Sequence, residues 1–241
     1  MLICIGGFCL DKIHDVMFLT IITINRNNAN GLERTMKSVL SQTRANYNYV
    51  VVDGASTDSS VEVVRRYAPF FGNRIKWISE PDKGIYNAMN KGIRMASGEY
   101  VEFLNSGDCL ASEDVVSRMS AALKERGKTS ILYGNMLKDM PDGSILRDKC
   151  FAGRDISFLG FYTGALNHSS AYIRRSLFDK YGMYDESLKI VSDWKWYLQS
   201  IVLGEEKQCY VDLDVTLFDM GGISETNKDL DKGKGGRFWS L

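Results

Sequence analysis

The stretch FLTIITINRNNANGLERTMKSVL, residues 18–40, combines a strand pattern with a helix pattern. Residues 18–24 are a continuous run of apolar and β-branched side chains, which is typical of a strand buried on both faces. Asn30-x-x-Glu33 then offers a capping box for the start of a helix. Apolar residues follow at helical spacing, namely Leu32, Met36, Val39 and Leu40. This stretch therefore predicts the first strand and helix of an α/β protein.

The alternation of strand and helix continues to residue 134. Residues 49–52 predict a second strand that ends abruptly at Asp53-Gly54, and a helix is expected from about Ser59. The later elements of this half are expected as strands over 75–79, 100–104 and 131–133 and helices from Ile85 and over 115–123. Such alternation implies βαβ units with right-handed crossovers. We predict a mostly parallel, Rossmann-like sheet flanked by helices, with ligands bound beyond the carboxyl ends of its strands.

The rhythm changes after residue 135, where we predict a smaller lobe of mixed structure. Pro141-Asp142-Gly143 predicts the turn of a hairpin. A strand is expected over residues 168–173 and a helix over residues 193–202. On that helix we expect Trp194 to face the core and Trp196, on the opposite face, to be free to stack on a sugar.

The predicted organisation of the chain has four parts. The boundaries are an N-terminal extension over 1–16, a first half over 17–134, a second half of the same domain over 135–225 and a flexible tail over 226–241. The extension precedes Met17, from which the sequence begins like the first strand of an α/β protein. The tail is rich in Lys, Asp and Gly and has little to bury.

Composition excludes several classes of protein. The chain has 241 residues, 44% of them hydrophobic, which is enough for a large core. Its 30 basic and 30 acidic residues cancel, so no net field attracts nucleic acid. No apolar run reaches the roughly 18 residues that span a bilayer. Five scattered cysteines without a C-x-x-C pair predict a reduced, cytoplasmic protein.

Carboxylates follow three successive predicted strands. They are Asp53, Asp82 and Asp108, and Asn25 and Asn27 end the first strand. Carboxylates at one edge of a sheet repel one another unless a cation or hydrogen-bond donors compensate, and Mg²⁺ or Mn²⁺ with phosphate oxygens is a common compensation. Any one of these residues alone is better explained as a turn or cap residue. Three at successive strand ends favour a binding site.

Three segments resemble glycosyltransferase family 2, whose fold is called GT-A. VVDGASTDSS (residues 51–60) is similar to its V-[DE]-D-G-S-x-D segment, and residues 80–108 are similar to the stretch that runs into its aspartate-rich metal motif. VSDWKWYL (residues 191–198) resembles the segment that carries its catalytic base. The resemblance covers residues 18–224, and it is strongest to bacterial members that assemble surface polysaccharides.

The resemblance implies an inverting transfer from a nucleoside-diphosphate-sugar donor. Asp53 would accept a hydrogen bond from the nucleotide base, with Asn25 lining the same pocket. Asp82 and Lys83 would face the base, ribose or diphosphate. The acceptor would be the hydroxyl of a saccharide or of a lipid-linked saccharide.

The remaining roles concern the metal and the proton. Asp108 would coordinate a divalent metal, Mn²⁺ or Mg²⁺, which offsets the charge of the leaving diphosphate. Asp193 would take the proton from the acceptor hydroxyl, which is a poor nucleophile without a base. The family's Asp-x-Asp-Asp motif is Asn105-Ser106-Gly107-Asp108 in this chain, so metal binding is expected to be weaker. Asn105 is expected to bind on the donor side, where its carbonyl oxygen can ligate.

Two other segments are assigned weaker roles. His168 is a candidate contact for the diphosphate or the acceptor, although a lone histidine is more often a packed or surface residue. The glycine pair in Gly221-Gly222-Ile223-Ser224 resembles one in the family, where a structural turn is favoured over a closing loop.

The sequence leaves open whether the tail contacts a membrane and whether the protein transfers a sugar or only binds the nucleotide sugar. The tail residues Lys232, Lys234, Arg237, Phe238 and Trp239 could touch anionic lipid at the inner face of the membrane, although a disordered end is favoured. The alternative function is a nucleotide-sugar binding protein with little transferase activity, which the altered metal motif favours and the acidic Asp193 opposes. A Rossmann dehydrogenase is rejected because INRNNANG, not G-x-G-x-x-G, follows the first strand.

Overall fold

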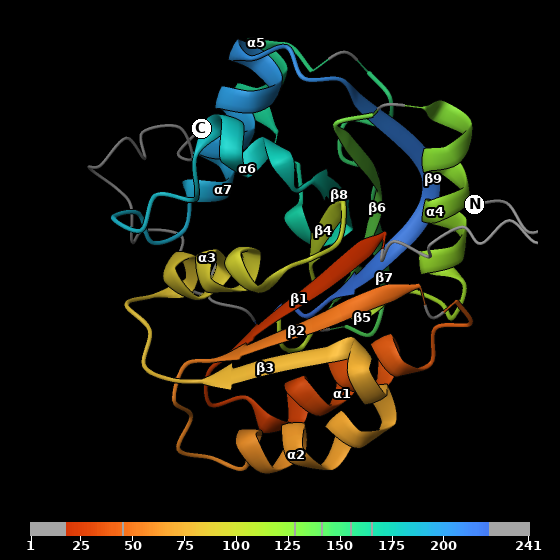
Figure 1. The fold of residues 1–241 in the computed structure, drawn as a ribbon. Coiled ribbons are helices and arrows are strands. Elements are labelled where there is room, and N and C mark those ends of the chain that lie inside the picture. The colour runs from red at the N-terminus through yellow and green to blue at the C-terminus, as the bar shows by residue number, and fades with distance from the viewer. Residues whose placement is uncertain are drawn as a thin grey trace, which may run out of the picture.

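The computed structural model describes residues 18–221, apart from residues 45, 128, 141, 155 and 165. Nine strands within this part of the chain form one sheet in the order β3-β2-β1-β4-β8-β6-β9-β5, with β7 paired to β6 (Figure 1). The predicted α/β fold, a mostly parallel sheet flanked by helices, is confirmed. The predicted boundary between the halves at residue 134 falls within β6, and the division stays a prediction.

The first half has the predicted alternation. Its elements are β1 (Leu19–Asn25), α1 (Ala29–Leu40), β2 (Tyr47–Asp53), α2 (Ser60–Phe71), β3 (Ile75–Ser79), α3 (Ile85–Met95), β4 (Tyr100–Phe103), β5 (Cys109–Leu110), α4 (Val115–Arg126) and β6 (Ile131–Asp139). The β1 strand pairs in parallel with β2 and β4, and β2 pairs in parallel with β3. These four strands therefore end at one edge of the sheet.

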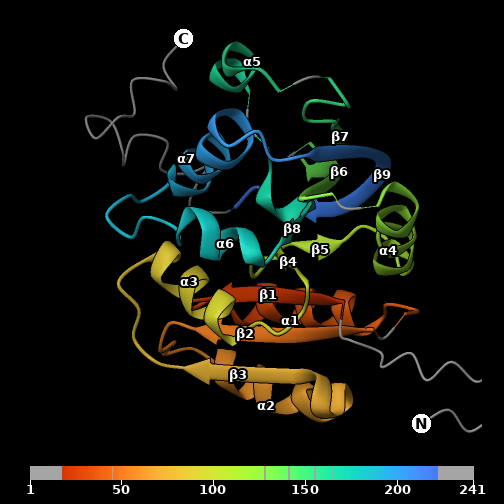
Figure 2. The same ribbon diagram turned by 45° about the horizontal axis from the view of Figure 1, so that its top comes forward.

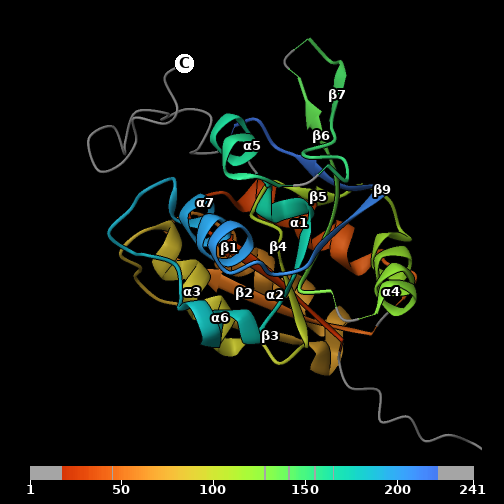
Figure 3. The same cartoon turned by 90° about the horizontal axis from the view of Figure 1, so that it is seen from above.

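The second half mixes strand directions. Its elements are β7 (Ile145–Asp148), α5 (Phe158–Thr163), η2 (His168–Ser170), β8 (Ala171–Arg174), α6 (Ser176–Tyr181), α7 (Ser192–Tyr197), η3 (Leu198–Leu203) and β9 (Gln208–Phe218). The β8 strand is antiparallel to both β4 and β6 and separates them. The predicted hairpin is confirmed by the antiparallel pairing of β6 with β7, and it extends away from the sheet in Figure 3.

Helices cover both faces of the sheet (Figures 1 and 2). One core cluster lies between the sheet and α1, α2 and α4, and the other lies between the sheet and α3, α6 and α7. Successive side chains of a strand point to opposite faces. In β1, Ile21 accordingly belongs to the first cluster and Ile22 to the second. Both faces of the central strands are buried, which explains their uninterrupted apolar sequence.

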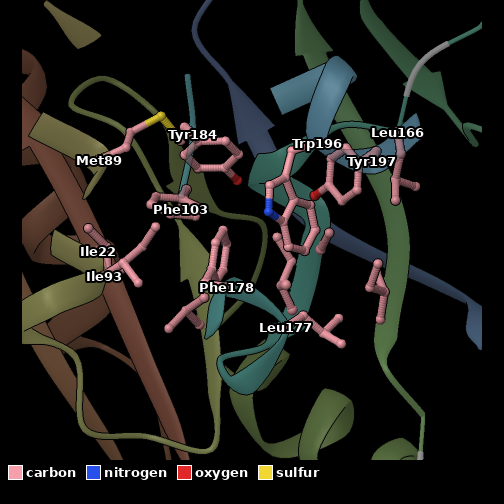
Figure 4. Close-up of a cluster of buried hydrophobic side chains, with 14 of the residues drawn as sticks. Ile22, Met89, Ile93, Phe103, Leu166, Leu177, Phe178, Tyr184, Trp196 and Tyr197 are labelled. Carbon is pink, nitrogen blue, oxygen red and sulfur yellow. The ribbon is translucent and has the colours of Figure 1, made fainter. Parts of the chain in front are cut away.

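Both tryptophans pack against the core, and Trp196 is the more deeply buried of the two. Trp196 is 1% exposed and stacks on Phe178, with ring centroids 4.6 Å apart, in the cluster of Figure 4. Trp194 is only half-buried, and its Nε1 donates to the Phe161 carbonyl at 3.1 Å. The prediction that Trp196 is free to stack on a sugar is wrong, because α6 and Tyr184 enclose its ring.

Two predicted boundaries are also wrong. The cap of α1 is Asn28, whose Oδ1 accepts from the Gly31 N–H at 3.1 Å, rather than Asn30. His168 lies in a 3₁₀ turn, η2, and the strand begins only at Ala171. The turn places His168 just before the first residue of β8. Because β8 is antiparallel to β4, this position lies at the edge of the sheet where polar residues gather.

Several expectations fall on residues that the structure does not describe. They concern the extension over 1–16, Gly222-Ile223-Ser224 and the tail over 226–241 with its lipid contact. Among the described residues, none of the helices has the length and apolarity needed to cross a membrane.

Candidate functional site

The first part of the site is a row of polar residues where β1, β2 and β3 end. Asn25, Asp53 and Ser79 lie side by side in the register of these strands. Their side chains meet: Asn25 Nδ2 donates to Asp53 Oδ1 at 2.8 Å, and the Ser79 hydroxyl donates to Asp53 Oδ2 at 2.7 Å. The parallel pairing of buried strands thus brings residues that are 26 and 28 positions apart into one cluster.

Asp53 is held as a carboxylate by four donors. Besides Asn25 and Ser79, the Ser56 N–H donates to Oδ2 at 2.9 Å and the Ser56 hydroxyl donates to Oδ1 at 2.5 Å. Burial raises the pKa of Asp53, but these hydrogen bonds outweigh burial and lower the pKa overall. The site therefore presents a fixed negative charge with its orientation set by neighbours.

Asp82 reaches the same edge from the loop after β3. Its side chain is 7% exposed and lies against Gly54, where an added Cβ atom would be 2.1 Å from Asp82 Oδ2. The Gly84 N–H donates to Oδ1 at 3.0 Å, and Arg26 lies 3.9 Å from the same oxygen. Only a glycine at position 54 leaves room for this carboxylate beside Asp53. Lys83 is exposed, and its N–H donates to Asn87 Oδ1 at 3.2 Å.

The second part of the site is the loop Asn105–Asp108, which continues from β4. The loop follows the end of β1, because the Ser106 N–H donates to the Ile24 carbonyl at 3.1 Å. Thr35 of α1 fixes the loop by donating to the Asp108 carbonyl at 2.7 Å and accepting from the Gly107 N–H at 3.0 Å. The loop is therefore anchored to both β1 and α1.

Asp108 is buried and only partly satisfied. Its Oδ1 accepts from the Asp219 N–H at 2.9 Å, whereas Oδ2 has no hydrogen-bond partner within the described residues. Burial raises the pKa of Asp108 to about 7, against smaller opposing effects of the Asp219 N–H, His168 and Arg34. A buried carboxyl oxygen without a partner is costly, and a bound cation would satisfy it.

Asn105 offers a second unsatisfied oxygen. Its Oδ1 is buried and has no partner among the described residues. Oxygen atoms of this kind suit a hard cation that keeps its other ligands from phosphate and water. The described residues contain no cluster of three or more His, Cys, Asp or Glu side chains that could hold a metal by themselves. A cation here would therefore depend on oxygens from a bound ligand.

The third part of the site joins His168 to Asp193 at the start of α7. His168 Nδ1 lies 3.0 Å from Asp193 Oδ2, and Asn105 Nδ2 lies 3.1 Å from His168 Nε2. Burial lowers the pKa of His168, but the hydrogen bond and charge of Asp193, with the charge of Asp108, outweigh burial and raise it. One imidazole ring thus links the Asn105–Asp108 loop to Asp193.

The other oxygen of Asp193 is also occupied. Tyr86 of α3 and the Trp194 N–H both donate to Oδ1, each at 2.9 Å. The Ile190 carbonyl accepts from the same Tyr86 hydroxyl, so the two acceptors share its one proton. The Asp193 side chain is still 19% exposed, so solvent or a ligand can reach it.

The structure therefore gathers most of the predicted residues into two adjoining groups. Asn25, Asp53 and Asp82 form the first group, and the second group consists of Asn105, Asp108, His168 and Asp193. Lys83 lies on the loop beside the first group with its side chain exposed. Both groups flank the end of β1.

Sequence reasoning missed several residues that contact these groups, among them Ser56, Ser79, Tyr86 and Asp219. Ser56 carries a usable signal, because a serine three residues after an aspartate in a turn commonly bonds to it. Asp219 carries no such signal, since it reaches Asp108 only through the pairing of β9 with β5.

Comparisons with known proteins agree on one family. A sequence model described as "Glycosyl transferase family 2" matches residues 20–182. An uncharacterized glycosyltransferase of Mycobacterium tuberculosis is 34% identical over 190 residues, which cover 78% of this chain and 70% of the relative.

Solved structures with similar folds include two that hold a nucleotide sugar. Staphylococcus aureus TarS 1–349 in complex with UDP-GlcNAc has a TM-score of 0.69 at 18% identity, over 84% of this chain and 58% of that one. The mannosyltransferase PcManGT of Pyrobaculum calidifontis, in complex with GDP-Man and Mn²⁺, has a TM-score of 0.63 at 18% identity, over 83% of this chain and 56% of that one. This chain spans little more than half of either neighbour, and 36% of a longer TarS chain. At these identities the likeness establishes the fold.

Proposed function

The chain belongs to glycosyl transferase family 2 and is a glycosyltransferase, and on that basis we propose that it is an inverting enzyme of surface polysaccharide synthesis. It moves a sugar from a nucleoside-diphosphate-sugar to a hydroxyl of a saccharide or lipid-linked saccharide. The observation that carries this proposal is the linkage of Asp193 through His168 to the Asn105–Asp108 loop. Through His168 the proposed base is linked to the loop proposed for the cation.

The donor nucleotide is proposed to bind over the first group of residues. Asp53 lies at a strand end, where parallel sheets bind ligands, and its carboxylate accepts a hydrogen bond from the base. Asn25 lines the same pocket, and Asp82 and Lys83 face the base, ribose or diphosphate. The low pKa of Asp53 supports this role, because an ionised acceptor makes the stronger hydrogen bond.

A divalent cation, Mn²⁺ or Mg²⁺, is proposed to bind Asp108 with help from Asn105. The unpartnered Oδ atoms of these two residues are the observation in its favour. When bound, the cation would offset the negative charge of the leaving diphosphate. With one carboxylate in the loop, the cation is expected to bind tightly only together with the nucleotide.

Asp193 is proposed to be the general base. As the acceptor hydroxyl attacks the anomeric carbon, its proton passes to the Asp193 carboxylate, and the bond from that carbon to the diphosphate oxygen breaks on the opposite face. A positioned base contributes about 10²–10⁴-fold to such a step. A protein that only bound nucleotide sugars would need no such base, and the relatives named as glycosyltransferases favour the enzyme.

The place of action is proposed to be the cytoplasm, at the inner face of the membrane where a lipid-linked acceptor would be met. Support comes from Cys109, Cys150 and Cys209, which are free thiols.

A nucleotide screen tests the donor site. The melting temperature is measured with UDP, GDP, dTDP or CMP, each with Mn²⁺, Mg²⁺ or chelator. A ligand at 100 times its Kd adds about 2.7 kcal/mol, which is a rise of roughly 5–11 °C for a domain of this size. We expect one nucleoside diphosphate to raise the melting temperature, more so with metal. Asp53→Ala should abolish the rise.

Asp142→Ala is the matched control. Asp142 is an exposed aspartate of the β6–β7 turn, and its partner is Ser144. Its loss should leave the nucleotide effect unchanged. If none of the nucleotides raised the melting temperature under any metal condition, the proposed donor site would be refuted.

A further inference from the structure

We propose that His168 is a positioning residue that orients Asp193 as the base, rather than a ligand of the donor. This inference rests on the proposed function of Asp193. His168 is held by three contacts that leave its ring little freedom. Nδ1 contacts Asp193, Nε2 contacts Asn105, and the ring lies edge-on to Phe103 with centroids 6.4 Å apart.

The direction of the two hydrogen bonds follows from their partners. A carboxylate only accepts, so the proton between His168 and Asp193 belongs to Nδ1. The Asn105 amide nitrogen only donates, so Nε2 accepts. This arrangement describes a neutral imidazole with its proton on Nδ1. Both ring nitrogens are thereby engaged by protein atoms, which leaves neither of them to bind a phosphate oxygen.

The hydrogen-bond partners of the two Asp193 carboxylate oxygens identify the oxygen that takes the proton. Each carboxylate oxygen has about two acceptor positions. Within the described residues, Oδ1 accepts from both Tyr86 and the Trp194 N–H, whereas His168 is the one partner of Oδ2. Oδ2 therefore keeps an acceptor position for the substrate hydroxyl. His168 occupies the other one, and this restricts the direction from which the hydroxyl can approach.

His168 also links the proposed base, Asp193, to the loop proposed for the cation. In an inverting transfer the base and the leaving diphosphate lie on opposite sides of the anomeric carbon. The ring joins Asp193 to Asn105, which precedes the proposed metal residue Asp108 by three positions. A misplacement of about 1 Å in such a geometry can cost 10²-fold in rate. The ring thus fixes the base relative to the loop.

Two substitutions at His168 separate its contacts. The amide nitrogen of asparagine lies close to the place of Nδ1, so His168→Asn can keep the donor to Asp193 while losing Asn105. Glutamine reaches about as far as Nε2, so His168→Gln can keep the contact with Asn105 while losing the donor to Asp193. The measurements are kcat for turnover of UDP-GlcNAc or GDP-mannose with Mn²⁺, the Kd for UDP or GDP, and the melting temperature.

We expect His168→Gln to lower kcat by about 10- to 100-fold and to leave the nucleotide Kd within about twofold of wild type. His168→Asn should keep kcat within about fivefold of wild type. In an Asp193→Asn background, His168→Gln should cause no further loss, because residues that act through one another are not additive. A merely structural role would lower the melting temperature of both variants without this pattern.

Several outcomes would overturn the inference. They are a nucleotide Kd that rises in step with the loss of kcat, a wild-type kcat in His168→Gln, or a full additional loss in the Asp193→Asn background. If His168→Gln does not fold, a kcat for His168→Asn as low as that of Asp193→Asn, with normal nucleotide binding, overturns it as well. If wild type turns over no sugar of UDP, GDP, dTDP or CMP, the proposed function fails and this inference fails with it.

Discussion

Replacing Asp53 by asparagine tests whether this residue is held as an acceptor of four hydrogen bonds. Two of its donors are N–H groups: Asn25 Nδ2 at Oδ1, which also lies 3.3 Å from the Ser56 hydroxyl oxygen, and the Ser56 N–H at Oδ2. Asparagine puts an NH₂ group in place of one oxygen. In either orientation of the amide, that NH₂ group faces one of these two donors. At least one hydrogen bond to the charged carboxylate is therefore lost. When the NH₂ group faces the Ser56 N–H, that donor also loses its partner.

The magnitude follows from these losses. A hydrogen bond to a charged group contributes about 1.5–3 kcal/mol, and an unsatisfied buried donor costs about 1–3 kcal/mol. Asp53 is fully buried, so water does not replace the lost partner. Because removing the buried charge offsets part of the loss, we expect a fall of about 2–4 kcal/mol in the free energy of unfolding. This corresponds to roughly 4–16 °C in melting temperature.

Urea unfolding at pH 7 measures the difference, and Asp58→Asn is the control. Asp58 accepts from two backbone N–H groups, those of Ala29 and Ser60, each at 3.0 Å, but it is exposed. Its substitution should cost less than about 1 kcal/mol, because water can replace the carboxylate. The pKa of Asp53 is lowered in the folded protein, so its contribution is present at neutral pH and is lost as pH falls through that pKa. A wild-type stability for Asp53→Asn at pH 7 would refute the reasoning.

Two further predictions concern stability. Burial raises the pKa of Glu102 well above 4.5, with a smaller opposing effect of Tyr172, so its stabilising protonated form is lost as pH rises through the folded pKa. Wild type should therefore lose stability from about pH 5 upward relative to Glu102→Gln. If urea unfolding showed the same change in the free energy of unfolding from about pH 5 to 9 for both proteins, the prediction would be contradicted. An added Cβ at Gly92 would lie 2.4 Å from Ile22 Cγ2, so Gly92→Ala should cost about 1–2 kcal/mol after its gain in helix propensity. That cost should shrink in an Ile22→Ala background, and additive effects in the double-mutant cycle would refute the steric cause.

Most of the parallel half of the sheet was predictable because β1, β2 and β4 are buried on both faces. The strand predicted over residues 75–79 and the helix predicted to begin at Ile85 have these bounds in the structure. The strand-end rule then located Asn25 and Asp53, whose pairing follows directly from the register of β1 and β2.

The other half was less predictable, since its strands are joined by distant pairings. The β9 strand, QCYVDLDVTLF, alternates polar and apolar residues and was not identified, although it carries the chain to Asp219. The insertion of β8 between β4 and β6 depends on antiparallel pairing that no local pattern encodes. His168 was singled out as a lone histidine, but its link to Asp193 appears only when η2 and α7 are brought together.

The role of Asp193 is best tested by comparing turnover and nucleotide binding in Asp193→Asn. Release of nucleoside diphosphate from the preferred nucleotide sugar gives kcat, and calorimetry gives the Kd of the nucleotide. We predict that kcat falls about 10²–10⁴-fold while the Kd stays within about threefold of wild type. A variant that keeps more than a tenth of the wild-type kcat would contradict the proposal that Asp193 is the base.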